Sequence, residues 1–190
     1  MFFKTFTAAA SLFLGVSTAL PQAAGGSLSS DAKFTLMALR SASDIHFAGF
    51  EAAKSSLFLH LPSQDASCDA GAAESATFYL KDGGLYLYAA SAAPQQLYAD
   101  RSGMGQGKLG YTTGAQPAPT NGERTPFTLD ENNDLTLDGA GFLACPNSID
   151  GAWSVWVSAG VDQPAGNSGC LSFSARAVEA PTPNGCLYTE

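Results

Sequence analysis

The sequence predicts an all-β domain, and three observations carry that prediction. Apolar residues alternate with polar or small ones in many short runs, which is typical of strands that bury one face. Glycine, asparagine and aspartate cluster between the runs, as at 81–84 and 131–134, where they favour tight turns. Helical periodicity is confined to one candidate, "GFEAAKSSL" at 49–57, which is short enough to be a single turn.

Twelve runs are candidate strands. Strict alternation is clearest where "KFTLMAL" begins the series and where "FYLKDGGLYL" follows it, with phenylalanine and leucine at every second position. The candidate strands cover residues 33–39, 44–50, 57–61, 76–80, 84–90, 95–99, 108–113, 126–129, 134–137, 141–145, 153–158 and 171–178.

A weak internal repeat suggests how these strands are arranged. The run from Phe78, "FYLKDGGLYL", matches "FTLDENNDLTL" from Phe127 as an aromatic-x-leucine pair, an acidic turn and a leucine-x-leucine pair. Related runs lie at Phe34 and near Phe173. Twelve strands in three blocks of four fit a β-trefoil, which is the architecture we predict. A two-sheet β-sandwich or a barrel is the alternative, because any hairpin shares this apolar alternation.

The N-terminal residues have the three-part pattern of a secretory signal peptide. Lys4 precedes a short apolar run, and small residues close the segment at Ala19. We predict a signal peptide over residues 1–19, with cleavage after Ala19 and Ala24 as the second choice. The Gly/Ser/Ala-rich residues 20–32 are predicted to be a flexible lead, and residues 33–190 a single domain with its own core.

Charge and hydropathy exclude several classes of partner. The formal net charge is −8, and loss of Lys4 with the signal peptide makes it −9, so nucleic-acid phosphates and anionic lipid surfaces should repel the protein. No later apolar run is long enough to span a membrane. The polar C-terminus "TPNGCLYTE" lacks the hydrophobic tail of a GPI-anchor signal.

The chain has four cysteines, and export favours their oxidation. They are too widely spaced for a zinc site built from close cysteine pairs, and an even number in an exported domain predicts two disulfides. Three pairings are open. The one we favour joins Cys170 to Cys186, which would tie down the C-terminal tail, and Cys68 to Cys145.

Glycine-rich and acidic stretches resemble ligand-binding motifs only formally. The stretch "DRSGMGQGKLGYTTGAQPAP", residues 100–119, contains G-x-G-x-x-G, but prolines follow where a helix should bind pyrophosphate. Its glycines are therefore predicted to turn the chain. The run "DENNDLTLD" has calcium-like spacing but lacks the EF-hand glycine and glutamate, so a hairpin turn is preferred. No cofactor or metal ion is predicted.

Catalytic residues are equally hard to find. His46 and His60 lie inside apolar strand patterns, and no nucleophile elbow accompanies them. Some pair of carboxylates is inevitable among seventeen acids, so a glycosidase pair has no specific signal here. The sequence therefore predicts a protein that is not an enzyme.

Aromatic residues are the best candidates for ligand contact. Trp153 and Trp156, three residues apart in "GAWSVWVS", should lie on opposite faces of a strand, so that one can be buried and the other exposed. Tyr86 and Tyr88 share one face. An exposed tryptophan or tyrosine ring can stack on a sugar, although all four residues can equally complete a small β core.

Three long strings make the sequence recognisable. "SATFYLKDGGLYLYAASAAPQ", "DRSGMGQGKLGYTTGAQPAP" and "ACPNSIDGAWSVW" resemble the secreted fungal cell wall proteins of the PhiA type, and the resemblance runs from about Lys33 to Tyr188. It implies an exported, wall-associated, non-catalytic protein linked to hyphal wall, phialide and conidium development, and some relatives are described as IgE-binding. Where relatives have an Asn-x-Ser sequon, this chain has Asp65-Ala66-Ser67; N-glycosylation is not expected, whereas O-mannosylation of Ser/Thr-rich turns remains open.

Three functional hypotheses follow. The first is a structural wall protein, held in the polysaccharide matrix by wall polysaccharide or by other wall proteins. The second is a lectin-like module whose exposed aromatic residues bind wall glycan. The third, and least favoured, is a secreted enzyme or an effector aimed at a host.

Overall fold

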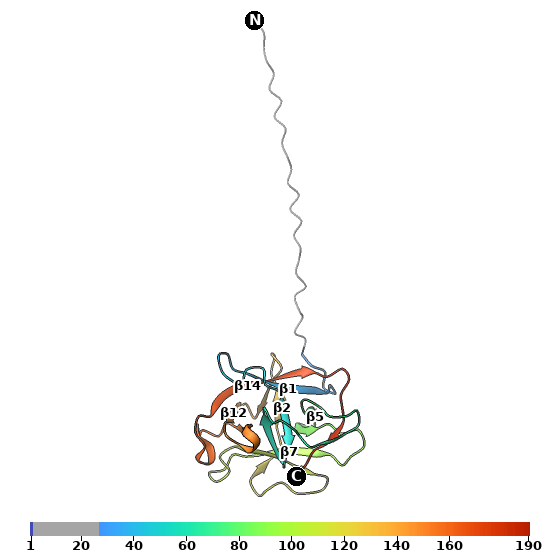
Figure 1. Ribbon diagram of the computed structural model, residues 1–190, viewed down its shortest axis with the longest axis vertical. Coiled ribbons are helices and arrows are strands. Elements are labelled where there is room, and N and C mark those ends of the chain that lie inside the picture. The colour runs from blue at the N-terminus through green and yellow to red at the C-terminus, as the bar shows by residue number, and fades with distance from the viewer. Residues whose placement is uncertain (2–26) are drawn as a thin grey trace.

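The computed structural model describes residue 1 and residues 27–190, and this part of the chain is built almost entirely from strands (Figure 1). The predicted signal peptide and the first residues of the predicted lead lie outside the described residues. Two short 3-10 helices, η1 (Ile149–Gly151) and η2 (Pro164–Gly166), are the described helical segments. The strands are β1 (Phe34–Leu39), β2 (Phe50–Ala53), β3 (Ser56–Leu59), β4 (Ser67–Cys68), β5 (Thr77–Lys81), β6 (Gly84–Leu87), β7 (Gln95–Asp100), β8 (Lys108–Thr113), β9 (Gly122–Glu123), β10 (Phe127–Leu129), β11 (Asp134–Leu137), β12 (Phe142–Cys145), β13 (Trp153–Val157), β14 (Leu171–Glu179) and β15 (Cys186–Leu187).

Nine strands close into an antiparallel barrel. Their order is β1-β5-β6-β7-β8-β3-β13-β12-β14, and β14 returns to β1 through a six-residue register from Phe34↔Glu179 to Leu39↔Ser174. The remaining strands of this sheet lie outside the ring: β2 pairs with β3, β9 with β7, and the β10–β11 hairpin with β14. Closure leaves few free strand edges, which is how all-β proteins avoid edge-to-edge association.

The all-β prediction is confirmed, whereas the trefoil is not supported and the barrel alternative describes the sheet. Both halves of the internal repeat do form hairpins, β5–β6 and β10–β11. However, β5–β6 is part of the closed ring, and β10–β11 is attached outside it at β14. The repeat therefore reflects the alternation that any hairpin needs and does not mark a threefold axis.

The helical candidate at 49–57 is wrong. These residues form the β2–β3 hairpin, with Ala53 opposite Ser56 and a two-residue loop of Lys54 and Ser55. Both loop residues have positive φ, 48° and 54°, as a type I′ turn requires. The candidate strand at 44–50 is mostly turn, because a strand first begins at Phe50.

The barrel interior is the hydrophobic core. Alternating residues of the strands fill it, and Phe34, Leu36, Phe78 and Leu87, from the neighbouring strands β1, β5 and β6, are all at most 1% exposed. The ring of Phe50, from β2, packs edge-on against Phe78 and Phe142 with centroid distances of 6.4 and 6.5 Å. The period-2 pattern therefore identified the inward face of these strands correctly.

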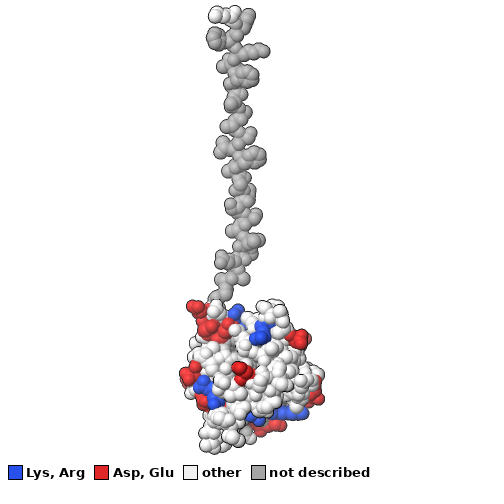
Figure 2. Space-filling view, turned by 90° about the vertical axis from the view of Figure 1, so that its left-hand side faces the viewer, with Lys and Arg blue, Asp and Glu red and all other residues white. Residues whose placement is uncertain are grey.

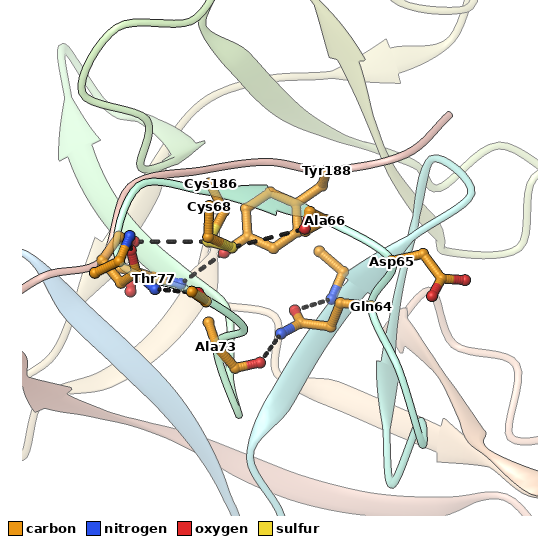
Figure 3. The surroundings of a disulfide bond; sticks show 12 residues. Gln64, Asp65, Ala66, Cys68, Ala73, Thr77, Cys186 and Tyr188 are labelled. Atoms are coloured by element: carbon orange, nitrogen blue, oxygen red, sulfur yellow. Dashed lines mark hydrogen bonds between the residues drawn. A yellow bond between two sulfur atoms is a disulfide. The ribbon is translucent and has the colours of Figure 1, made fainter.

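The disulfides follow the strand registers, and the favoured pairing is wrong. Cys68 is bonded to Cys186 because β4 and β15 place them directly opposite each other (Figure 3). Cys145 is bonded to Cys170 because β12 pairs with β14 at Ala144↔Leu171, which brings the next residues on either side together. Two disulfides among four cysteines are confirmed, and the C-terminal tail is tied to β4 instead of to Cys170.

The C-terminal segment is fixed against the barrel by hydrogen bonds as well as by a disulfide. The Tyr188 hydroxyl accepts a bond from the Thr77 amide at 3.3 Å, and burial raises the pKa of Tyr188 to about 12 (Figure 3). The Thr189 carbonyl accepts bonds from the Tyr111 hydroxyl and from the Ser55 amide. These contacts hold the last residues against β2–β3, β5 and β8.

Candidate glycan-binding site

The two tryptophans of β13 lie on opposite faces of the barrel wall, as their spacing predicts. Trp153 packs against the hydrophobic core. Trp156 lies on the outer face with Ser154, and its indole Nε1–H donates to Ser154 Oγ at 3.0 Å. Both side chains are partly exposed, and Trp156 is the one that lies on the outer face of the barrel.

Trp156 lines a hollow where β3, β8 and β13 meet. The hollow has a volume of about 240 Å³. Besides the indole, it presents three serine hydroxyls, a carboxamide and an ammonium group, whereas its floor is aliphatic. The lining residues are Ser56, Leu57, Phe58, Lys108, Leu109, Ser148, Ser154, Val155, Trp156 and Asn167.

Tyr86 and Tyr88 belong to an aromatic cluster elsewhere on the outer face of the barrel. Tyr86 stacks on Tyr79 of β5 with ring centroids 5.2 Å apart, and Tyr88 meets Tyr79 edge-on at 6.4 Å. The ammonium of Lys33 lies over Tyr79 and Tyr88, 5.2 and 5.8 Å from the ring centroids. These cation–π contacts cover part of the cluster and limit the face that a sugar could reach.

A row of outward side chains extends from this cluster across the strands. The register pairs Tyr79 with Tyr86, Tyr86 with Gln96, and Gln96 with Thr112. Arg124 joins the far end of the row by donating to Gln96 Oε1 at 2.9 Å and to Thr112 Oγ1 at 2.6 Å. Among the described residues, no carboxylate forms an ion pair with Arg124.

The tryptophan and tyrosine candidates do not form one site. Strands β7 and β8 lie between β6, which carries the tyrosines, and β13. Sequence reasoning missed the partners on both surfaces: Tyr79 and Lys33 on one, and the serines of the hollow on the other. Tyr79 could have been found from the sequence, because it follows the buried Phe78 in its strand and alternation places it on the outer face. The serines come from three separate segments, so no local sequence pattern connects them.

A larger groove lies between the segment that leads into β1 and the β5–β6 and β10–β11 hairpins. Its volume is about 730 Å³, and it is lined by residues 28–34, 79–83 and 127–129. Leu28, from the predicted lead, packs against the core and donates its amide hydrogen to Asn133 Oδ1 at 3.0 Å. The groove is mainly apolar, and it shares Tyr79 and Lys33 with the aromatic cluster.

The other motifs from the sequence have structural roles. The glycine-rich stretch forms the β7–β8 connection, in which Ser102 donates its amide hydrogen to Asp100 Oδ1 and Gly107 donates to the Asp100 carbonyl. Asp130 turns the β10–β11 hairpin by accepting from the amides of Asn132 and Asp134, each at 2.8 Å. No group of three or more metal-ligating side chains is found among the residues that the structure describes.

The histidines are separate and make local contacts. His46 Nδ1 accepts a bond from the Arg40 amide at 3.1 Å, and its ring packs on Phe47. The ring of exposed His60 bonds to the Asp44 carbonyl through Nε2 at 2.9 Å. In neither contact does a carboxylate orient the imidazole ring, as it does for a histidine that acts as a general base.

Charge is distributed in small groups over the surface. On the face drawn in Figure 2, acidic and basic side chains are interspersed and most of the surface is uncharged. Within the described part of the chain, no helix is long and apolar enough to cross a membrane. One carboxyl is different: Glu51 on β2 is buried, and desolvation raises its pKa to about 8.

Comparison with known proteins places the chain in a family. The model of the family described as "PhiA-like secreted protein" matches residues 34–189, which include the whole barrel. The chain belongs to the PhiA-like family of secreted proteins. Two relatives support this: "Cell wall protein phiA" of Aspergillus fumigatus is 52% identical over 187 residues, 98% of each chain. The protein of the same name from Aspergillus niger is 53% identical over 156 residues, 82% of this chain and 85% of its own.

Membership of the PhiA-like family confirms the recognition made from the three long strings and the location that it implied. The protein of Emericella nidulans with the same name is 47% identical over 186 residues. The chain is therefore a secreted fungal cell wall protein. No solved structure matches it.

Proposed function

We propose that this protein is a non-catalytic structural component of the fungal wall that supports the hyphal wall and the development of phialides and conidia. The observation that carries the proposal is family membership over nearly the whole described domain. The developmental part rests on the resemblance to the PhiA type. The non-catalytic part is supported by the roles of the ionisable groups, since His46, His60 and Asp130 are engaged in local structural contacts.

The architecture suits a protein that must persist outside the cell. Closure of the barrel leaves few free strand edges, and two disulfides span 118 and 25 residues of sequence. Crosslinks of this kind stabilise extracellular domains mainly by restricting the unfolded chain. Wall polysaccharide or other wall proteins would hold such a domain in place.

A second candidate function is a lectin-like module that binds wall polysaccharide through aromatic residues. The hollow beside Trp156 favours it, because an indole and several hydroxyl groups converge there. The two candidates share a location and differ in what retains the protein.

Depletion from solution separates the two candidates. Purified mature protein is incubated with insoluble β-glucan, with chitin and with stripped hyphal wall, and the protein left in solution is measured. Saturable loss onto one pure polysaccharide supports the lectin. Retention on intact wall alone supports attachment through other proteins and ends the lectin hypothesis. For the developmental role, a strain lacking the protein should form fewer phialides and conidia; normal numbers would contradict that role.

A further inference from the structure

The hollow beside Trp156 exists because three strands meet at their ends only. β3 and β13 share two register pairs, whereas β8 shares a single pair with each of them, and these contacts enclose a triangle. The floor of this triangle is made by Leu57, Leu109 and Val155, which belong to the strands' inward faces. The contacts at its corners are Ser154↔Phe58, Trp156↔Lys108 and Ser56↔Gly110.

Several polar groups in the hollow have no partner within the described chain. The hydroxyls of Ser56 and Ser148 make no hydrogen bond there, and the ammonium of Lys108 makes no ion pair. The Asn167 carboxamide donates from Nδ2 to the Pro164 carbonyl at 2.7 Å, and its oxygen is left without a described donor. Four polar groups without a described partner thus belong to residues that line one small space.

The indole is held in place at the edge of this space. Its Nε1–H donates to Ser154 Oγ at 3.0 Å, so the polar edge of the ring is used internally. Trp156 also lies opposite Leu143 in the β12–β13 register, and Leu143 is 6% exposed although it is on the outer face. The ring is therefore pre-oriented, which lowers the entropic cost of stacking a ligand on it.

We propose that this hollow binds one neutral pyranose ring, stacked on Trp156 and hydrogen-bonded to Ser56, Ser148 and Asn167. The volume of about 240 Å³ suits a single sugar residue, and Lys108, the charged residue of the lining, is solvent-exposed, so the rest of the lining is uncharged. Sugar hydroxyls donate and accept at once, which matches hydroxyl and carboxamide partners, while the C–H face of the ring matches the indole. The proposal rests on the lectin-like candidate above and names its site and ligand class.

Indole signals provide a direct test, because the chain has two tryptophans and only Trp156 lines the hollow. Mature protein labelled with ¹⁵N is titrated with the methyl glycosides of glucose, mannose and N-acetylglucosamine. We expect one of them to shift the Trp156 Nε1–H resonance saturably, with a Kd of about 1 mM, while the Trp153 resonance stays in place. Fluorescence of W153F, in which Trp156 is the remaining emitter, should report the same affinity.

Two sets of variants separate the site from the fold. S56A/S148A removes hydroxyls that have no described protein partner, so we expect an unchanged thermal midpoint and roughly tenfold weaker binding. W156F keeps a ring with a smaller face and should also weaken binding about tenfold. Y86A alters the tyrosine cluster on the other side of β7 and β8 and should leave the affinity as it is.

Failure would be informative at two levels. A folded protein whose Trp156 signals respond to none of the three glycosides overturns the proposal, as does binding that S56A/S148A and W156F leave intact. If polysaccharide depletion persists in those variants, the lectin-like function stands and its site lies elsewhere. If neither glycoside nor polysaccharide binds, both fail.

Discussion

The side chain of Gln95 pairs with the backbone of Tyr188 as a neighbouring strand would. Gln95 Oε1 accepts from the Tyr188 amide at 2.9 Å, and Gln95 Nε2 donates to the Tyr188 carbonyl at 2.9 Å. The same Nε2 donates to Thr113 Oγ1 at 3.0 Å, and Gln95 is fully buried. One carboxamide on β7 therefore satisfies both polar groups of a backbone segment that has no sheet partner at that residue.

Replacing Gln95 by alanine should destabilise the protein strongly. Q95A leaves the amide and carbonyl of Tyr188 without their partner, and each unsatisfied buried group costs about 1–3 kcal/mol. We expect the free energy of unfolding in urea to fall by roughly 2–6 kcal/mol in total. N121A removes a carboxamide at an exposed position where no side-chain hydrogen bond is described, so it is the matched control and should change the free energy of unfolding by about 0.5 kcal/mol or less. Similar losses in both variants would contradict the clamp.

The two disulfides should contribute unequally. In the chain-entropy model, closing the 118-residue separation of Cys68–Cys186 is worth about 5 kcal/mol, and the 25-residue separation of Cys145–Cys170 about 3.5 kcal/mol. C68A/C186A should therefore lower the unfolding free energy by more than C145A/C170A does. Each pair has one fully buried cysteine, so the packing losses are comparable. Peptide mapping checks the pairing itself, and a Cys68–Cys145 peptide would refute it.

Local pattern predicted much of this fold, because alternation is a property of single strands. The inward positions of β1, β5, β6, β10 and β11 could be identified from phenylalanine and leucine at every second residue. The closing of the ring could not, since the contact between β1 and β14 joins residues more than 130 positions apart and leaves no local trace. The same applies to the disulfides, whose pairing is set by which strands become neighbours.

In the candidate site, too, the sequence predicted the features that depend on a single strand and missed those that depend on which strands become neighbours. The spacing of Trp153 and Trp156 predicted opposite faces of β13, and Trp153 packs against the core while Trp156 lines the hollow, although both are partly exposed. The hollow itself depends on where β3, β8 and β13 diverge, and Ser56, Ser148 and Asn167 come from unrelated segments. The helical candidate at 49–57 was wrong for a different reason: "GFEAAKSSL" has the composition of a helix, but burial of Phe50 and Leu57 in the barrel favours a hairpin.

Burial of Glu51 should make stability depend on pH. Its pKa is about 8 in the folded protein against an ordinary value of 4.5, so the folded state retains a proton that the unfolded state loses. The stability tied to that proton is fully present below pH 4.5 and is lost as the pH rises through about 8, at up to roughly 1.4 kcal/mol per pH unit.

The substitution E51Q tests this dependence. Glutamine stays neutral, so the variant should be more stable than the natural protein at about pH 9 and close to it at about pH 5. Urea unfolding at both pH values measures the difference, and E179Q, which removes an exposed carboxyl, is the control. If the unfolding free energy of E51Q depends on pH as steeply as that of the natural protein, ionisation of Glu51 does not destabilise the fold and the prediction is wrong.

The glycine-rich loop provides the last prediction, because two of its glycines have opposite surroundings. Gly107 has φ of +95°, and a Cβ there would lie 1.8 Å from the Val157 carbonyl oxygen. That oxygen belongs to the backbone, so no side-chain rotation can relieve the clash. Its own carbonyl accepts the Val157 amide at 2.8 Å, so the close approach joins β8 to β13. A Cβ at Gly103 would meet nothing within 4 Å.

G107A should therefore lower the unfolding free energy by about 3 kcal/mol or more, through strain and loss of the contact between Gly107 and Val157. G103A should leave it within about 0.5 kcal/mol. Thermal or urea unfolding of the two single variants gives the comparison. Equal, small effects would mean that the glycines are not required for this turn, and that the loop conserves its shape by the hydrogen bonds of Asp100 and Ser102 alone.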